Sequence, residues 1–403
     1  MVTLRTSNFL NVSVYMRINY ESMRGIFRGI LLYEKVHGPW NIHLASEHHY
    51  LEEDSNSPNV LVRANAVPDG IIAWGNHEPI AQKLLQAIHA GTPVILINPW
   101  EEYNAIPEFH TCGRISCDSY RVGEAAAEFY LERNYRNFAF VGARKKVIWS
   151  RRRGEGFVQT LTEKGYTVPV YEPANEKISQ KQDEIRLGKW LRKLPPKTGL
   201  FAAMDPRGKQ VIDLCHRWGI RVPQEISVLG VDNDEFLCQM TTPALSSIHL
   251  HLEKAGYHAA EMLHRRMRNL PLEQKTYWYG VQRIEARAST EWVVVEHPLV
   301  AEALTFIRNH CSELITINDI ARQFDVSRRT LEKTFRAELG RTIFQEILRQ
   351  RLQKLSRLLA ETDIPLSELS SICGFASDSY MGKVFKKIYG STLLEYRLQS
   401  RTR

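Results

Sequence analysis

The sequence predicts two parts of different fold class: a two-lobed α/β region with parallel sheets flanked by helices, then an all-α region. Three observations support this. From residue 11 to about residue 287, short apolar runs alternate with amphipathic stretches, as in strand–helix–strand units. In the last hundred residues a helix-turn-helix pattern occurs twice. The length of 403 residues exceeds what one hydrophobic core usually supports, so two or three domains are expected.

The apolar runs of the first part predict strands, and most are followed by a stretch with helical spacing. There are enough of them for two sheets, so we expect two α/β lobes. Ligands of such sheets bind beyond the carboxyl ends of the strands. The predicted strands are residues 12–16, 69–74, 93–97, 138–142, 198–202 and 226–230, and the predicted helices are residues 21–36, 79–89, 121–133 and 205–218.

The first helix-turn-helix pattern covers residues 317–335. Ile320 and Ala321 lie on one face of a short predicted helix, and Leu331 and Phe335 lie on one face of the next. A small residue such as Ala321 lets two helices cross closely. Ser327 stands where the second helix needs an N-cap, because its hydroxyl can accept orphan backbone N–H groups.

The second pattern covers residues 366–388 and repeats the same order. A Gly374-Phe375 turn separates the helices, Ser377 caps the second helix, and Met381 and Phe385 face inward. The amphipathic stretch 343–359 joins the two patterns. Its leucines at helical spacing indicate either a zipper or core packing, and the short run favours core packing. These leucines are Leu348, Leu352, Leu355 and Leu359.

Composition limits the class of protein. No apolar run approaches the roughly 20 residues of a membrane span. Residues 1–11 lack the apolar core of a signal peptide. The six cysteines are scattered without a CxxC pair, which gives no sign of a zinc site or a disulfide framework. We therefore expect a cytoplasmic protein with reduced thiols.

Positive charge is concentrated at the C-terminus. Residues 298–403 hold 17 Lys and Arg against 12 Asp and Glu, and thus +5 of the total net charge of +8. About a quarter of the chain carries more than half of the excess. This distribution favours a module that binds a polyanion.

The C-terminal residues resemble the DNA-binding domain of the AraC/XylS family of transcription regulators. Three positions depart from the family pattern: Met381 for Phe, Leu393 for Pro, and Asp325 for Gly in the first turn. Asp tolerates the left-handed conformation, so the turn is retained. The resemblance rests on Gly374-Phe375, Ser379-Tyr380, Val384-Phe385-Lys386-Lys387, Gly390, Thr392 and Tyr396-Arg397.

Residues 10–290 resemble the sensor domain of LacI/GalR regulators, which is similar to periplasmic sugar-binding proteins. The resemblance is carried by Asp205, by residues 219–233 and 242–248, by Asp118 opening a helix, and by Arg153 ahead of Gly156-Phe157. It implies two lobes that close on a small ligand, often a sugar.

The usual partner of this sensor is an N-terminal helix-turn-helix, whereas here the DNA module follows the sensor. Bacterial xylose-operon regulators share this order, and the whole chain is similar to that group, including Thr290-Glu291 and His297-Pro298. The resemblance implies a sensor at residues 1–290 and a DNA-binding domain at residues 291–403. It also implies an activator that responds to D-xylose or a related sugar, binds operator DNA, contacts RNA polymerase and forms a homodimer mainly through the first lobe.

A sugar site needs charged groups that bond vicinal hydroxyls and an aromatic face for the ring. The alternative reading is that the aspartates cap helices. With the resemblance, Asp232 and Arg153 are expected to contact the ligand most directly. The candidate ligand residues are Asp118, Arg153, Asp205, Asp232, Asn19 and Trp74.

Helical spacing places the candidate DNA contacts on faces opposite Leu331 with Phe335 and Met381 with Phe385. Arg329 is the best candidate for guanine, because its planar fork matches the O6/N7 edge. Lys387 is expected to touch phosphate. The candidates are Arg328, Arg329, Glu332 and Lys333 in the first unit and Ser379, Tyr380, Lys383 and Lys387 in the second.

Other functions find less support. The chain lacks GxGxxG opening a helix, GxxxxGK[ST], GxSxG and HExxH, so no enzyme class or cofactor is indicated. An α/β enzyme with an appended DNA module and a sensor of a protein partner remain alternatives. His48-His49 and His249-x-His251 lack further ligands at metal-site spacing. The basic runs 144–146 and 151–153 are expected to be solvated, with one arginine turned inward.

Overall fold

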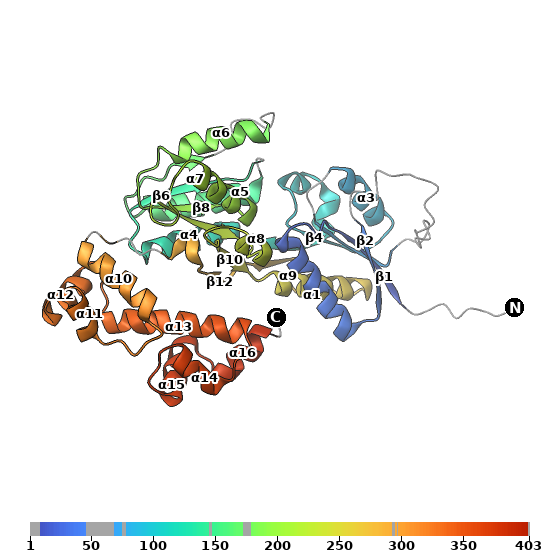
Figure 1. Cartoon of the computed structure of the whole chain (residues 1–403). Coiled ribbons are helices and arrows are strands. Elements are labelled where there is room, and N and C mark those ends of the chain that lie inside the picture. Colours follow the sequence, from blue (N-terminus) through green and yellow to red (C-terminus); the bar gives the residue numbers. More distant parts are fainter. Residues whose placement is uncertain are drawn as a thin grey trace. The chain divides into compact units, whose positions relative to one another are not determined.

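The computed structural model describes residues 9–45, 68–74, 78–144, 147–171, 179–291, 295 and 297–401 (Figure 1). The chain forms two compact units, Met1–Trp292 and Val293–Arg403. The first unit is α/β and the second is helical, which confirms the predicted fold class. Among the described helices, none is long and apolar enough to cross a membrane.

The first lobe contains a six-stranded parallel sheet with the strand order β11-β5-β4-β3-β1-β2. Its strands are β1 (Leu10–Tyr15), β2 (Trp40–Ala45), β3 (Gly70–Trp74), β4 (Val94–Ile97), β5 (Gly113–Cys117) and β11 (Thr276–Tyr279). Helices α1 (Glu21–His37) and α9 (Leu252–Met267) lie side by side against this sheet, and α3 (Glu78–His89) and the short helices η1 (Glu101–Ala105) and η2 (Pro107–Thr111) complete the lobe.

The second lobe contains a six-stranded sheet with the order β12-β10-β9-β8-β6-β7. It is parallel except for β12, which runs antiparallel to β10. The strands are β6 (Asn137–Val141), β7 (Val170–Tyr171), β8 (Thr198–Ala202), β9 (Ile226–Val231), β10 (Ser246–Leu250) and β12 (Val281–Glu285). The helices are α4 (Ser119–Leu131), α5 (Ile148–Thr162), α6 (Gln180–Leu191), α7 (Asp205–Arg217), α8 (Glu235–Gln239) and η3 (Ala288–Thr290).

The chain passes between the lobes after β5, after β10 and after β11. Backbone hydrogen bonds tie these crossings together. The Asp118 N–H donates to the Tyr279 carbonyl at 2.8 Å, and the His251 N–H donates to the Gly280 carbonyl at 3.0 Å. The three connections therefore lie together at one edge of the lobes.

The C-terminal unit has seven described helices: α10 (Pro298–His310), α11 (Ile317–Gln323), α12 (Arg328–Leu339), α13 (Ile343–Glu361), α14 (Leu366–Ile372), α15 (Asp378–Tyr389) and α16 (Leu393–Arg401). They enclose two apolar cores. Ile320, Leu331 and Phe335 belong to the first core, and Met381 and Phe385 belong to the second. The inward positions predicted for both helix-turn-helix patterns are confirmed.

Helix α13 belongs to both cores. Its first turns contribute Ile343 and Ile347 to the first core. Leu352, Leu355 and Leu359 are buried in the second core, with Leu348 packed against it. The leucine spacing thus reflects core packing, as predicted.

The turns follow the predicted capping chemistry. The Ser327 side chain accepts from the Thr330 N–H, and the Ser377 side chain accepts from the Tyr380 N–H. Asp325 adopts φ 50°, the left-handed conformation expected at that turn. Gly374 has φ 75°, and a Cβ there would lie 2.4 Å from the Cys311 carbonyl oxygen, so only glycine fits.

Glu346 joins the start of α13 to the turn before it. The carboxylate is fully buried and accepts from Arg341 Nε at 2.7 Å and from Arg349 Nη2 at 2.6 Å. Burial raises the pKa of Glu346, but the Arg349 hydrogen bond and the charges of Arg349 and Arg341 outweigh it and lower the pKa to about 2.

Glu346→Gln is expected to destabilise the C-terminal unit by roughly 3 kcal/mol at pH 7, the equivalent of the pKa depression. A depressed pKa stabilises the fold above the ordinary carboxyl value of 4.5, and this contribution is lost as pH falls toward 2. Differential scanning calorimetry of the full chain should show the variant's deficit shrinking below pH 4.5. Glu302→Gln, on the exposed face of α10, is the control. A deficit that is constant from pH 7 to pH 3 would contradict the assignment.

Candidate ligand cleft and DNA-reading helices

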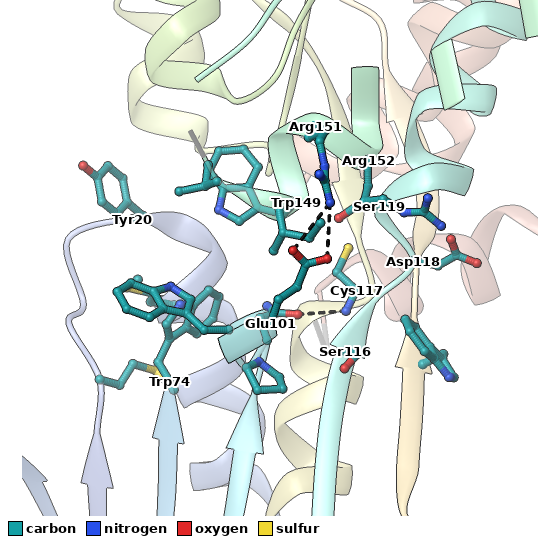
Figure 2. A pocket seen from close by; sticks show the side chains of 18 of the residues that line it. Tyr20, Trp74, Glu101, Ser116, Cys117, Asp118, Ser119, Trp149, Arg151 and Arg152 are labelled. Atoms are coloured by element: carbon teal, nitrogen blue, oxygen red, sulfur yellow. Dashed lines mark hydrogen bonds and ion pairs between the residues drawn. The ribbon is translucent and has the colours of Figure 1, made fainter. Parts of the chain in front are cut away.

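A cleft of about 790 Å³ lies between the two lobes of the sensor. Its walls come from the carboxyl ends of β1, β3, β4 and β5 in the first lobe and from the start of α5 in the second (Figure 2). This is the position that parallel sheets predict for a ligand. The walls include the charged residues Arg17, Glu101, Asp118, Arg151 and Arg152 and seven aromatic residues: Tyr15, Tyr20, Trp74, Trp100, Tyr120, Trp149 and Trp278.

A buried charge pair, Arg153 and Asp232, lies next to the cleft residue Trp149, although neither member of the pair is among the residues that line the cleft. Arg153 and Asp232 are only 5% and 6% exposed, and the distance from Arg153 Nη2 to Asp232 Oδ1 is 3.7 Å, too long for a hydrogen bond. The Arg153 guanidinium lies 5.0 Å from the ring of Trp149, which lines the cleft, and its Nη1 donates to the Ala203 carbonyl at 2.6 Å.

Both members of this pair keep an unmatched polar atom. Arg153 Nε and Asp232 Oδ1 are buried and have no hydrogen-bond partner within the described part of the chain. Burial raises the pKa of Asp232 to about 6, although the nearby Arg153 charge lowers it. Buried polar groups without partners are costly. Groups of a polar ligand would satisfy both atoms.

The loop after β9 holds Asp232 in a strained conformation. Asp232 has φ 102° and Asn233 has φ 56°. Hydrogen bonds fix both: the Asp232 N–H donates to the Ile248 carbonyl at 2.9 Å, and the Asn233 N–H donates to Ser247 Oγ at 3.0 Å. Backbone strain of this kind concentrates at ligand sites.

Asp205 holds this loop in place by hydrogen bonds. It is fully buried, and its carboxylate accepts from Ser247 Oγ at 2.6 Å and from the Asp234 N–H at 2.8 Å. Burial, with the charge of Asp232, raises the pKa of Asp205 well above the ordinary value. The structure does not place Asp205 among the residues that line the cleft. Arg153 and Asp232 are likewise absent from that lining, so three of the predicted ligand residues lie outside the cleft walls.

Residues that the sequence did not single out complete the cleft floor. Asn98 Oδ1 accepts from the Cys117 N–H at 2.8 Å, and its Nδ2 donates to the Tyr279 hydroxyl at 2.7 Å (Figure 2 draws the first of these bonds). Asn98 has φ 44°. The sequence did hold a signal for Asn98: it comes directly after the predicted strand 93–97, and ligands bind at the carboxyl ends of such strands.

Two ion pairs among the described residues join the lobes across the cleft. Arg24 of α1 contacts Asp234, which caps α8, at 2.6 Å. Arg151 of α5 contacts Glu101 at 3.2 Å (Figure 2). The second pair lies at the exposed mouth, so solvent weakens it.

The predicted DNA-reading side chains lie on α12 and α15. Arg328, Arg329 and Lys333 are exposed, while Glu332 is half-buried and pairs with Arg328 at 3.1 Å. On α15 the exposed side chains are Ser379, Tyr380, Lys383 and Lys387. Both sets lie away from the buried faces of their helices, as predicted.

Known proteins resemble both units and the whole chain. A periplasmic binding protein-like domain model matches residues 127–290, and a helix-turn-helix domain model matches residues 320–399. The xylose operon regulatory protein of Escherichia coli (strain K12) is 32% identical over 353 residues, which cover 86% of this chain and 88% of that protein. This chain belongs to the xylose operon regulatory protein family.

Two further comparisons extend over almost the whole chain. The family member of Haemophilus influenzae is 28% identical over 398 residues, 98% of this chain and 99% of its own length. A solved structure of the xylose-binding transcription activator xylR has 28% identity and a TM-score of 0.62, and covers 98% of this chain and 99% of that one. As a member of this family, the chain is a DNA-binding transcription regulator with a sensor domain.

The remaining candidate ligand residues differ in whether they line the cleft. Asp118 and Trp74 line the cleft. Asp118 also caps α4, accepting from the Arg121 N–H at 3.1 Å, so the capping alternative holds for this residue. Asn19 is exposed and absent from the cleft walls, and its carbonyl accepts from Arg24 at 3.0 Å.

The structure also bears on the predictions for the two basic runs and for the histidine pairs. Arg151 and Arg152 are exposed whereas Arg153 is buried, so the expectation of one arginine turned inward is confirmed. His48-His49 and residues 145–146 lie outside the described residues. In the part that is described, including His249 and His251, no cluster of three or more metal-binding side chains occurs.

The raised pKa of Asp232 has a testable consequence for the unliganded protein. A carboxyl whose folded pKa lies above its unfolded value stabilises the fold at low pH, and that contribution is lost as pH rises through about 6. The wild-type sensor should thus gain thermal stability between pH 7.5 and pH 5 relative to Asp232→Asn. Differential scanning fluorimetry of both proteins across this range measures the gain. Parallel curves for the two proteins would refute the role of Asp232.

Proposed function

We propose that this protein activates transcription of an operon for D-xylose or a related small sugar, which it binds in the cleft between the sensor lobes. The observation that supports this most strongly is the pair of buried, unmatched atoms on Arg153 and Asp232 beside an aromatic wall. Paired sugar hydroxyls can accept from the guanidinium and donate to the carboxylate, while the C–H face of a sugar ring packs on indole. The relatives' printed names supply xylose as the first sugar to test.

The signal is proposed to pass through the loop 232–234. A sugar held by Asp232 favours the loop conformation that presents Asp234 to Arg24 of the other lobe. The sugar shifts the equilibrium only by its difference in affinity for the two lobe arrangements. Operator DNA and RNA polymerase are the proposed macromolecular partners, in the cytoplasm, and no catalytic step is proposed, because the relatives are transcription regulators.

We further propose a homodimer formed mainly through the first lobe, as the family resemblance implies. Exposed Leu32 and Val36, one turn apart on α1, offer an apolar contact there. Light scattering at micromolar concentration that gives a monomer both with and without DNA would contradict the dimer.

D-Xylose or a related sugar is expected to raise the melting temperature of the full chain, as any ligand specific for the folded state does. Removal of one charged hydrogen bond should cost about 1.5–3 kcal/mol, more than tenfold in affinity. Arg153→Ala and Asp232→Ala should therefore bind the sugar at least tenfold more weakly in calorimetric titration. Asn19→Ala is the matched control, because Asn19 is exposed ahead of α1 and takes no part in the buried Arg153–Asp232 pair.

Other outcomes separate the alternatives. Turnover of any sugar would favour an enzyme with a DNA module. A panel of pentoses and hexoses with neither binding nor turnover would favour a sensor of a protein partner. Wild-type affinity in folded Arg153→Ala and Asp232→Ala would show that the ligand lies elsewhere.

Arg329 is proposed to contact guanine and Lys387 to contact phosphate. Arg329→Ala should lose about 1–3 kcal/mol on the cognate operator and relax preference at one base pair. Lys387→Ala should weaken binding to all sequences alike and flatten its salt dependence. Fluorescence anisotropy with operator and random duplexes at several salt concentrations measures both. An equal loss on both duplexes for Arg329→Ala would make Arg329 a phosphate contact.

A further inference from the structure

Cys117 differs from the other cysteines of the chain, all of which lie in described segments. It ends β5, is half-buried and lines the interlobe cleft. Asn98 Oδ1 accepts from the Cys117 N–H at 2.8 Å and so fixes the backbone there. Figure 2 shows the thiol on the side of this backbone that faces α5 of the second lobe. The buried cysteines are Cys112, Cys215, Cys238, Cys311 and Cys373.

The thiol of Cys117 lies close to the buried charge pair of the second lobe. Burial raises the pKa of this thiol, the positive charge of Arg153 lowers it, and the negative charge of Asp232 raises it. Both charges therefore act on the sulfur at short range. Of these three residues, Cys117 alone lines the cleft. Cys117 is thus the place on the first lobe where the pair meets the cleft.

The charge pair itself points to a polar ligand at this place. Arg153 Nε and Asp232 Oδ1 are buried and have no hydrogen-bond partner among the described residues. A thiol is only a weak donor and a weak acceptor, so Cys117 satisfies such atoms poorly. A hydroxyl group forms stronger bonds with a guanidinium and a carboxylate. A hydroxylated ligand that enters from the cleft meets the Cys117 side chain where it approaches the pair.

We propose that Cys117 is a ligand-contacting thiol and a modification site. A sugar in the cleft covers the sulfur, and a group attached to the sulfur keeps the sugar from Arg153 and Asp232. The proposal rests on the proposed sugar-binding function and adds a residue of the first lobe to the site. The modifying class is a small thiolating electrophile. With methyl methanethiosulfonate, the Cys117 thiolate attacks the sulfenyl sulfur, a disulfide forms, methanesulfinate leaves, and the thiol proton passes to solvent.

Labelling of the full chain with methyl methanethiosulfonate, read by peptide mass spectrometry, tests the proposal. The reaction is run at mildly alkaline pH, because burial raises the pKa of the thiol and only the thiolate reacts. Cys117 should be labelled first, since the other cysteines are buried. Saturating D-xylose should slow this labelling about tenfold, because a thiol covered by ligand is not accessible to the reagent. The labelled protein should bind D-xylose about tenfold more weakly in isothermal titration calorimetry, the equivalent of one lost charged hydrogen bond.

Two variants connect these effects to the one sulfur. Cys117→Ser should have the same affinity for D-xylose before and after treatment with the reagent, because it has no thiol in the cleft. Cys112→Ser is the matched control, because Cys112 directly precedes the same strand, is buried and is absent from the cleft walls. It should leave the labelling of Cys117 and its protection by the sugar unchanged.

A third variant decides the question even if the thiol proves unreactive. Cys117→Met places a longer side chain before the charge pair and should weaken D-xylose binding about tenfold in a protein that folds normally. Wild-type affinity in this variant or in the labelled protein would overturn the proposal. Equal labelling rates with and without bound sugar would also overturn it and leave the proposed function standing. If the untreated wild type binds neither D-xylose nor any other pentose or hexose, the proposed function is refuted together with this inference.

Discussion

The sensor depends on one unfavourable arrangement, the burial of Arg153 and Asp232 without a direct hydrogen bond between them. The fold holds Arg153 there by a close helix crossing. A Cβ on Gly123 of α4 would lie 2.1 Å from the Arg153 carbonyl oxygen, so only glycine lets the two helices approach. A Cβ on Gly156 of α5 would likewise lie 2.1 Å from the Tyr120 carbonyl oxygen of α4. The backbone of Arg153 is thus positioned by packing, independently of any ligand.

Asp232 is held by a second set of contacts, which also reaches the other lobe. Asp205 accepts from the Asp234 N–H, and Asp234 pairs with Arg24 of α1. The strained loop therefore has the buried carboxylate of Asp232 at one end and an interlobe ion pair two residues later. Because the loop is short and hydrogen-bonded, a change at Asp232 is transmitted to Asp234 without a long chain of intermediates. The proposed coupling of ligand binding to lobe arrangement depends on this one segment.

The sequence predicted what local chemistry determines. The strands ending at Trp74 and Ala202, the caps at Ser327 and Ser377, and the left-handed Asp325 all follow from periodicity or capping. It missed features that depend on distant segments. The strands β10 to β12 have mixed polar sequences, and β12 lies at the edge of its sheet, where it pairs with β10. The role of Asn98 depends on Tyr279, 181 residues away, and that of Asp205 depends on Ser247. Asp205 begins α7, and the sequence cannot distinguish a carboxylate at such a position that faces a ligand from one that faces a buried hydroxyl.

Helix α13 imposes a comparable constraint on the DNA-binding unit. Its 19 residues form a continuous helix of about 28 Å at 1.5 Å per residue. One end packs in the core of α11 and α12, and the other end packs in the core of α14 and α15. Successive major-groove segments on one face of DNA are about 34 Å apart. A helix of this length therefore suits two recognition helices that read adjacent turns, and Glu346 fixes its first turn. The separation of α12 from α15 is thus set mainly by the length of α13, which packs in both cores.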